Sequence, residues 1–287
     1  MGRTLGVAVA LSALAVFTTG WAGESALAVP TCFGLPATIV VPTLANENRQ
    51  INGTNGDDVI VGGAGDDIIF GDGGDDRICA RRGRDVVYGW EGNDHLSGAR
   101  GWDRLYAEMG NDVIRGGAGS DLLAGGVGSD LMQGGLGTDT ASFSQENLTG
   151  PMIVDLGAGT ATGVSDQDLL SPGTIENVVM NCTAVQDDVL IGDDRPNILT
   201  GGSGADLIRG SGGTDALYGG TPGQDAGDAI CTLDDGPDQL MGGLDDDRLY
   251  GQKNDDFLDG EEGTDELDGG LGTDACRNGE SVVACET

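Results

Sequence analysis

The chain has few of the residues on which most enzymes and nucleic-acid-binding proteins depend. Its 287 residues include one histidine, 4% aromatic residues, and 14 Lys and Arg residues against 48 Asp and Glu residues. With His95 as its single histidine, the chain cannot form an H-E-x-x-H zinc motif, and no residues around His95 match a histidine-based catalytic triad. No G-x-S-x-G or G-K-[ST] motif is present. Because the formal net charge is −34, we expect no nucleic-acid partner, and we expect no enzymatic activity.

Long apolar segments are also missing. Residues 5–17 are apolar but too few to span a bilayer, and no later stretch reaches eighteen apolar residues. With Arg3 before this run and Ala26-Leu27-Ala28 after it, residues 1–28 have the pattern of a signal peptide. The residues before Cys32 do not form a lipoprotein cleavage box. We therefore expect a soluble, secreted, extracellular product that begins at Val29 and does not insert into a membrane.

The six cysteines contain no C-x-x-C pair. An even number of cysteines in an exported chain favours disulfides over metal thiolates, and six cysteines allow fifteen connectivities. Order along a repeat protein favours near neighbours, which predicts the pairs Cys32–Cys79, Cys182–Cys231 and Cys276–Cys285. Buried free thiols are the alternative.

Glycine and aspartate, in contrast, are abundant and periodic. Ten nonapeptides run without a gap over residues 53–142, each with Gly at its fourth position and Asp at its sixth. The eighth positions are nearly all larger aliphatic residues: Ile60, Ile69, Ile78, Val87, Leu96, Leu105, Ile114, Leu123 and Met132, followed by Ala141. A disordered acidic tail is the alternative, but disorder gives no reason to keep three residue types in phase over ninety residues.

The spacing has a direct physical meaning. Glycine tolerates left-handed backbone, so the first six residues of each repeat can form a tight loop with exposed carbonyl groups. The last three residues form a short strand, whose alternation turns the eighth side chain towards the core and the seventh and ninth outwards. The sixth-position carboxylate lies where the loop ends. Stacked loops would therefore bring carboxylate and carbonyl oxygens together, and such ligands suit calcium.

One repeat cannot stabilise itself. A buried aliphatic side chain contributes roughly 1.5–3 kcal/mol, whereas ordering each of nine backbone units costs about 1–2 kcal/mol. Stacking against neighbouring coils helps, but the net charge opposes compaction. We therefore expect a divalent cation to be needed for folding and the calcium-free chain to be disordered.

The second half of the chain is less regular. Residues 143–182 interrupt the repeat, with strand-like segments at 151–156 and 175–180, and this piece either caps one roll or bridges two. The frame returns at 183–218, breaks in an insertion at 219–232, and continues to residue 277. Residues 29–52 and 278–287 are expected to be terminal caps. Asn197 replaces Asp at one sixth position, and Asp245 and Asn254 replace Gly at two fourth positions.

The G-G-x-G-x-D-x-U-x pattern resembles the RTX or haemolysin-type calcium-binding repeat. The resemblance implies an all-β fold, a calcium-stabilised parallel β-roll with two nonapeptides per coil and two repeat blocks. Each Ca²⁺ would lie between loops of repeats i and i+2, held by sixth-position Asp side chains and loop carbonyls. The implied metal ligands are Asp58, Asp67, Asp76, Asp85, Asp94, Asp103, Asp112, Asp121, Asp130, Asp139, Asp188, Asp206, Asp215, Asp238, Asp247, Asp256, Asp265 and Asp274. A signal peptide departs from RTX toxins, which generally use a dedicated exporter and a C-terminal signal.

One loop of the first block departs from this acidic pattern, with Arg81, Arg82 and Arg84. These residues either weaken adjacent ion sites or pair with Asp side chains and replace a cation. Trp90, Trp102 and Tyr106 lie nearby and suggest a surface for a sugar or another partner, although exposed aromatic residues on loops are common. We expect a secreted calcium-binding protein; the alternative is an extracellular adhesive or matrix protein that uses the roll as a spacer, with a cell-surface or polysaccharide partner.

Overall fold

The computed structural model describes residues 30–40, 48–143, 150–164, 166–180, 185–220 and 236–286. The predicted signal peptide, the pair Cys182–Cys231 and most of the 219–232 insertion lie outside these residues. The described residues form strands, turns and bends, without a helix. Within them, no helix is long and apolar enough to cross a membrane.

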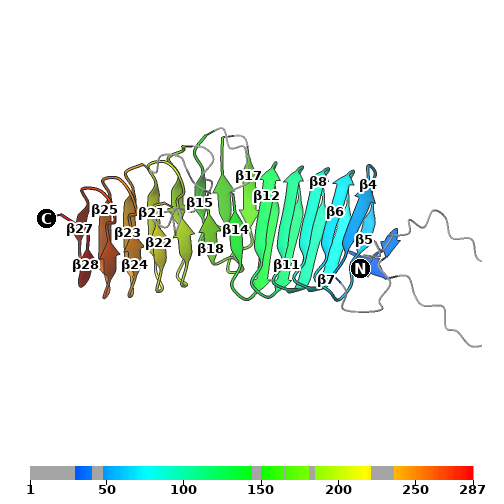
Figure 1. Ribbon diagram of the computed structural model, residues 1–287, viewed down its shortest axis with the longest axis horizontal. Coiled ribbons are helices and arrows are strands. Elements are labelled where there is room, and N and C mark those ends of the chain that lie inside the picture. Colours follow the sequence, from blue (N-terminus) through cyan, green and yellow to red (C-terminus); the bar gives the residue numbers. More distant parts are fainter. Residues whose placement is uncertain are drawn as a thin grey trace, which may run out of the picture.

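Two long sheets run side by side along the whole molecule (Figure 1). The first sheet contains, from one end to the other, β4 (Gln50–Thr54), β6 (Ile68–Gly73), β8 (Val86–Glu91), β10 (Arg104–Met109), β12 (Leu122–Val127), β14 (Thr140–Ser142), β18 (Asn177–Val179), β20 (Ile198–Thr200), β22 (Ala216–Tyr218), β24 (Arg248–Tyr250), β26 (Glu266–Asp268) and β28 (Ser281–Val283). The second contains β3 (Ile39–Val40), β5 (Val59–Val61), β7 (Arg77–Gly83), β9 (His95–Gly101), β11 (Val113–Ala118), β13 (Leu131–Leu136), β17 (Gln167–Leu170), β16 (Thr160–Thr162), β15 (Ile153–Asp155), β19 (Val189–Ile191), β21 (Leu207–Ser211), β23 (Gln239–Leu244), β25 (Phe257–Glu262) and β27 (Ala275–Arg277).

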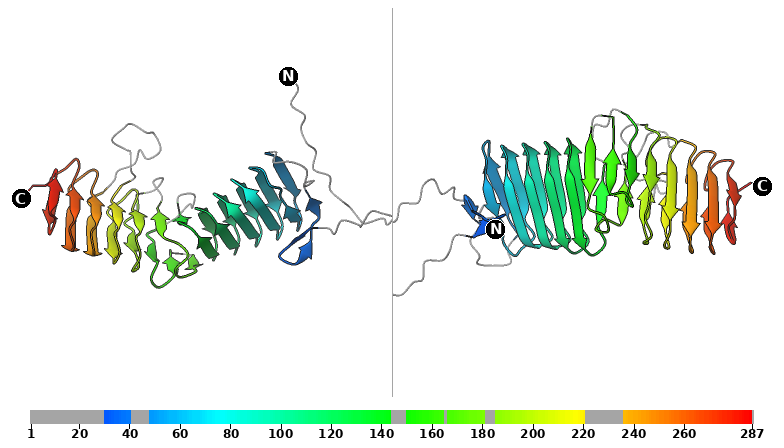
Figure 2. Two further views of the ribbon diagram at one scale, coloured as in Figure 1. Left: turned by 90° about the horizontal axis from the view of Figure 1, so that it is seen from below. Right: turned by 180° about the vertical axis from the view of Figure 1, so that it is seen from behind.

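The chain alternates between the two sheets, so that each coil contains two nonapeptides. Within the first block, every strand pairs in parallel with the strand 18 residues away, as Ile78 does with Ile60 and Leu96. Across the 219–232 insertion, the offset is 32 residues, yet the parallel pairing continues. The predicted all-β parallel roll is confirmed. Figure 2 shows from two further sides that the roll is elongated, with its ends far apart.

The core is a column of eighth-position side chains between the sheets. Ile60, Leu96, Leu105 and Met132 are fully buried, as are their equivalents through Leu267. The ninth-position rings of Phe70, Tyr88 and Tyr106 stack on the outer face of the first sheet, with centroids 5.3 and 5.1 Å apart. The predicted inward and outward alternation is confirmed, and each coil adds one thin layer to a continuous core.

The segment between the blocks belongs to the same roll. In the first sheet, β14 pairs directly with β18 in parallel. In the second sheet, β15, β16 and β17 form an antiparallel insertion whose outer strands pair in parallel with β19 and β13. The first of the two strand-like segments expected here contains β15, and the second contains β18. The segment therefore bridges two repeat blocks, because the first sheet continues through it without a break.

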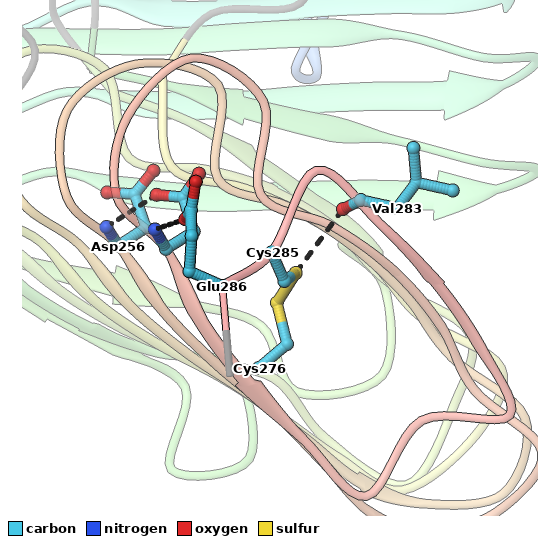
Figure 3. The surroundings of a disulfide bond; sticks show 6 residues. Asp256, Cys276, Val283, Cys285 and Glu286 are labelled. Carbon is cyan, nitrogen blue, oxygen red and sulfur yellow. Dashed lines mark hydrogen bonds between the residues drawn. A yellow bond between two sulfur atoms is a disulfide. The ribbon is translucent and has the colours of Figure 1, made fainter.

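Each half of the roll carries a disulfide near its outer end, and the sequence predicts both. The hairpin of β1 (Thr31–Cys32) and β2 (Leu35–Pro36) is tied to β7 by Cys32–Cys79, with Cα atoms 5.7 Å apart. At the other end, Cys276–Cys285 joins β27 to the final turn, and Cys285 Sγ lies 3.3 Å from the carbonyl oxygen of Val283 (Figure 3). None of the cysteines in the described ranges is free.

Candidate metal centres

The sixth-position aspartates form buried columns at the two edges where loops connect the sheets. All eighteen predicted ligands are buried. In the regular run, the backbone N–H of each aspartate donates to Oδ1 of the aspartate one coil further on, as from Asp58 to Asp76 (2.8 Å) and from Asp94 to Asp112 (2.6 Å). This geometry follows from the 18-residue register, and it aligns carboxylates along the axis of the roll.

The second carboxylate oxygen is the feature that needs an explanation. Among the described residues, Oδ2 is buried and has no hydrogen-bond partner in thirteen of the aspartates: Asp76, Asp85, Asp94, Asp103, Asp112, Asp121, Asp130, Asp139, Asp168, Asp215, Asp247, Asp265 and Asp274. An unpaired buried polar atom costs about 1–3 kcal/mol, and more when it is charged. A bound cation would remove this cost.

Burial also makes these carboxylates reluctant to ionise. Desolvation raises the pKa of Asp112 to about 8 and the pKa of Asp76 to about 8, with the neighbouring carboxylates adding a smaller effect. For the same leading reason, the pKa of Asp103 is raised to about 7 and that of Asp85 to about 6. Without a counter-charge, the folded column therefore holds protons near neutral pH.

Backbone carbonyls come close to the column carboxylates at the loops. At Gly101, the fourth position of its repeat, a Cβ atom would overlap the carbonyl oxygen of Gly83 one coil earlier and would lie 2.9 Å from Oδ1 of Asp103. Gly110 has the same relation to the carbonyl of Gly92 and to Oδ1 of Asp112. These glycines have a φ of 152° and 150°. Only a residue without a side chain leaves room for carbonyl and carboxylate oxygens to converge.

The arrangement fits calcium better than a transition metal. In the part of the chain that the structure describes, no three His, Cys, Asp or Glu side chains gather to hold a metal ion. A cation at the loops must therefore take backbone carbonyls together with carboxylates from successive coils. Such hard oxygen ligands and flexible geometry are those of Ca²⁺, which when bound would neutralise the column.

Two of the non-glycine fourth positions in the second block keep this geometry. Asp245 and Asn254 adopt φ of 75° and 73°. Their carbonyl oxygens approach Gly263 and Gly272, and Oδ1 of Asp265 lies near the first of these glycines. The loops that the sequence marks as irregular are therefore built like the others.

The first coil differs from the regular run. Both carboxylate oxygens of Asp58 accept hydrogen bonds, from Thr38 Oγ1 (3.1 Å) and from the backbone N–H and Oγ1 of Thr54 (both 2.8 Å). Asp67 likewise accepts from the backbone N–H groups of Arg49 and Gly63. These two aspartates thus have protein donors on each oxygen, whereas the later sixth-position aspartates of the first block, from Asp76 to Asp139, do not.

Asn197 has its polar atoms satisfied within the protein. Its Oδ1 accepts from the backbone N–H of Asp193, and its Nδ2 donates to the carbonyl oxygen of Glu176 (2.9 Å). Beside it, the Arg195 guanidinium bonds Glu176 Oε1 (2.6 Å), Asp193 Oδ2 (2.7 Å) and the carbonyl of Ile175. At this loop, an arginine occupies the role that calcium is expected to have elsewhere.

Several residues that continue the aspartate columns are not predictable from the repeat pattern. Asp168, in the interruption, accepts from the N–H of Asp130, and burial raises the pKa of Asp168 to about 7. Glu176 Oε2 accepts from the N–H of Asp139 in the same way. Glu280 and Glu286 do so for Asp265 and Asp274 at the C-terminal end, and Glu286 is labelled in Figure 3 near the Cys276–Cys285 disulfide. None of these four residues is at a sixth position of the nonapeptide frame. The one signal in the sequence is that each is an acidic residue outside the regular repeats.

Arg81, Arg82 and Arg84 do not replace a cation. The Arg84 guanidinium carbon lies 4.5 Å from the centroid of the Trp102 ring, and its backbone N–H donates to Asp66 Oδ1. The side chains of Arg81 and Arg82 form no ion pair with any described carboxylate. The possibility that these guanidinium groups pair with Asp side chains is thus not realised.

A comparison with known protein families gives independent support. The family model of the RTX calcium-binding nonapeptide repeat, which comprises 4 copies, matches residues 52–87, 75–105, 82–114, 106–141, 187–221, 234–267 and 241–275. These segments overlap, and together they span more than half of the chain. A search of curated proteins with this chain found no match.

Proposed function

This chain belongs to the RTX calcium-binding nonapeptide repeat family, and from that premise we propose that it is a secreted, non-enzymatic protein whose loops bind Ca²⁺ and fold into the roll on export. The observation that carries the proposal is the pair of buried carboxylate columns, in which one oxygen after another lacks a partner within the described residues. Backbone carbonyls lie beside these oxygens: a Cβ atom at Gly71 would overlap Oδ2 of Asp76 and would lie 2.7 Å from the carbonyl oxygen of Gly89.

Other features support export. RTX repeats are typical of secreted bacterial proteins, and the two described disulfides are compatible with an oxidising, extracellular location. Residues 1–28 add the signal-peptide pattern. Calcium is far more available outside cells than in the cytosol, so binding would follow export. Extracellular calcium modules work at dissociation constants of about 10⁻⁴–10⁻³ M.

The single histidine has a packing role and is assigned no reaction. His95 packs edge to face against Phe33, with centroids 5.5 Å apart, and burial lowers the pKa of His95. It contributes to docking the N-terminal hairpin on the second sheet. Arg115, whose guanidinium lies 5.2 Å from the same Phe33 ring, completes this contact.

The elongated shape favours a second candidate, an extracellular adhesive or matrix protein that uses the roll as a spacer stiffened by calcium. A twelve-stranded sheet with a spacing of about 4.8 Å would be roughly 55 Å long. Co-sedimentation with cell envelopes, with and without calcium, tests this candidate. Recovery in the pellet only when calcium is present favours the spacer role, and recovery in the supernatant in both conditions contradicts it.

A matched pair of variants tests calcium binding itself. Asp112→Asn removes a charge from the buried column but keeps an oxygen that can accept the Asp94 N–H. Asp57→Asn removes a charge from an exposed fifth position. Calorimetric titration with Ca²⁺ should show weaker and less cooperative binding for Asp112→Asn and nearly unchanged binding for Asp57→Asn. Equal losses from both would mean that charge density alone attracts calcium.

A further inference from the structure

We propose that one loop edge of the first block is a binding site for an anionic polysaccharide, with Arg81, Arg82 and Arg100 as the residues that hold its acidic groups. The three side chains line a shallow groove whose floor is made by Gly63, Ala64 and Ala99. They account for three of only 14 Lys and Arg residues in a chain with a formal charge of −34. Among the described residues, no carboxylate lines the groove.

The positions of Arg82 and Arg100 bring two positive charges close together. Arg82 and Arg100 are directly opposite each other on the paired parallel strands β7 and β9, about 4.8 Å apart along the roll. Like charges directly opposite in a sheet destabilise it, and neither side chain forms an ion pair within the described structure. A carboxylate or sulfate bridging the two guanidinium groups would remove this repulsion through charge-assisted hydrogen bonds.

The backbone is also unfavourable at this place. Arg81 has a φ of 89°, and Ala99, its partner one coil further on, has a φ of 77°. On the opposite edge, Asp72, Trp90 and Glu108 hold the same left-handed conformation, so this conformation is a regular property of the second position. On the edge of Arg81, the second positions of the coils further along the block are glycines, at Gly117 and Gly135. Arg81 therefore presents a side chain where these coils have none.

An exposed aromatic residue follows the groove in the sequence. Trp102, two residues beyond Arg100, is 59% exposed, and Arg84 lies over one face of its ring. Trp102 lines a second hollow with Arg84, Arg104 and the column residues Asp85, Asp103 and Asp121. A flat indole ring beside guanidinium groups offers an apolar contact for the ring face of a sugar and hydrogen-bond donors for its acidic substituents. A small anion such as phosphate has no apolar face and would not contact the Trp102 ring.

Two other classes of polyanion fit less well. Double-stranded DNA carries one charge per about 1.7 Å, and so dense an anion would be repelled by the remaining acidic surface. A flat anionic bilayer would contact more of that surface than the groove alone. A polysaccharide with one acidic group every one or two sugars is narrow enough to follow the groove and sparse enough to avoid this repulsion.

The test uses the calcium-loaded full chain and defined octasaccharides. Calorimetry should show binding of a hyaluronan octasaccharide, which carries only carboxylates, or of a heparin octasaccharide, which adds sulfates; the stronger of the two identifies the acidic group. Maltooctaose, which is neutral, should not bind. The double variant Arg82→Gln/Arg100→Gln should lower the affinity by about tenfold or more, and Trp102→Ala should lower it too. Arg209→Gln, an exposed arginine on β21 in the second block, should leave it within about twofold.

Far-UV circular dichroism separates folding from binding. Because the double variant removes a repulsive pair, it should fold at the same calcium concentration as the unaltered chain or at a lower one. Binding that is absent for both acidic octasaccharides, insensitive to the double variant, or equally reduced by Arg209→Gln would overturn the proposal. Tighter binding of a 20-nucleotide oligothymidylate or of phosphatidylserine vesicles through the same arginines would show that the partner class is wrong.

Discussion

Acid should partly replace calcium in folding this chain. The buried column aspartates have pKa values raised to about 6, 7 or 8 in the folded state, whereas an unfolded aspartate has a value near 3.8. The folded chain therefore binds more protons than the unfolded chain between these limits. Its calcium-free stability is greatest below pH ~4 and is lost as the pH rises through about 6–8.

The free energy linked to these raised pKa values is large enough to determine whether the calcium-free chain folds. Eleven aspartates have pKa values raised to about 6 or higher. Raising one pKa by about two corresponds to roughly 3 kcal/mol per group. Even a third of the total would equal the stability of a typical domain, about 5–15 kcal/mol. At pH 8 the calcium-free chain should therefore be unfolded.

The assay is far-UV circular dichroism in excess chelator at pH 5 and pH 8, with sedimentation to exclude aggregation near the isoelectric point. We expect β signal at pH 5 that disappears towards pH 8. Asp112→Asn should move the midpoint to higher pH, because a neutral amide needs no proton, and Asp57→Asn should leave it nearly unchanged. A β signal independent of pH, or one that grows as the pH rises without calcium, would refute the reasoning.

Three further predictions address the ends, the junction and the blocks. Cys32→Ser/Cys79→Ser should lower the free energy of unfolding in calcium by up to about 4 kcal/mol, measured by urea denaturation, and no change would show that the hairpin contributes nothing. Arg195→Gln should cost roughly 1–3 kcal/mol at every calcium concentration, whereas an effect seen only at low calcium would contradict its role as a built-in cation. Residues 53–142 should become protease-resistant at lower calcium than residues 183–277, because the second block has one asparagine ligand position and an interrupted frame; protection of the second block first would reverse this order.

Much of the roll is predictable from the sequence because three residue types recur every nine residues. In each repeat, Gly marks the loop, Asp marks the carboxylate position and an aliphatic residue marks the core position. The eighth-position side chains from Ile60 onwards form the core, as this spacing predicts. Near-neighbour order along a solenoid is enough to predict two disulfides.

The interruption could not be predicted in the same way. β16 is Thr-Ala-Thr between two glycines, a composition typical of a linker, and β17 is Gln-Asp-Leu-Leu, which is too short to show a strand pattern by itself. They form strands because the edges of β13 and β15 offer pairing partners, which is a tertiary effect. Asp168 joins the column through that pairing and not through any local motif.

The arginine loop shows a second limit. Charge alone suggests that Arg81, Arg82 and Arg84 could neutralise neighbouring aspartates. In the roll, however, the sixth-position carboxylates turn inwards while second- and third-position side chains line the outer edge. Arg195 reaches Asp193, which is two residues away in the same loop, and it also reaches Glu176, because this residue of the interruption follows Asp139 in the carboxylate column. Which arginine replaces a cation depends on that placement of Glu176.

The most direct test of calcium-driven folding is a calcium titration of the chelated full chain at pH 8, followed by far-UV circular dichroism. We expect a coil-like spectrum in chelator and a cooperative gain of β signal as calcium approaches the millimolar range, with magnesium at equal concentration producing little change. A full β spectrum in excess chelator at this pH, unchanged by added calcium, would contradict this expectation.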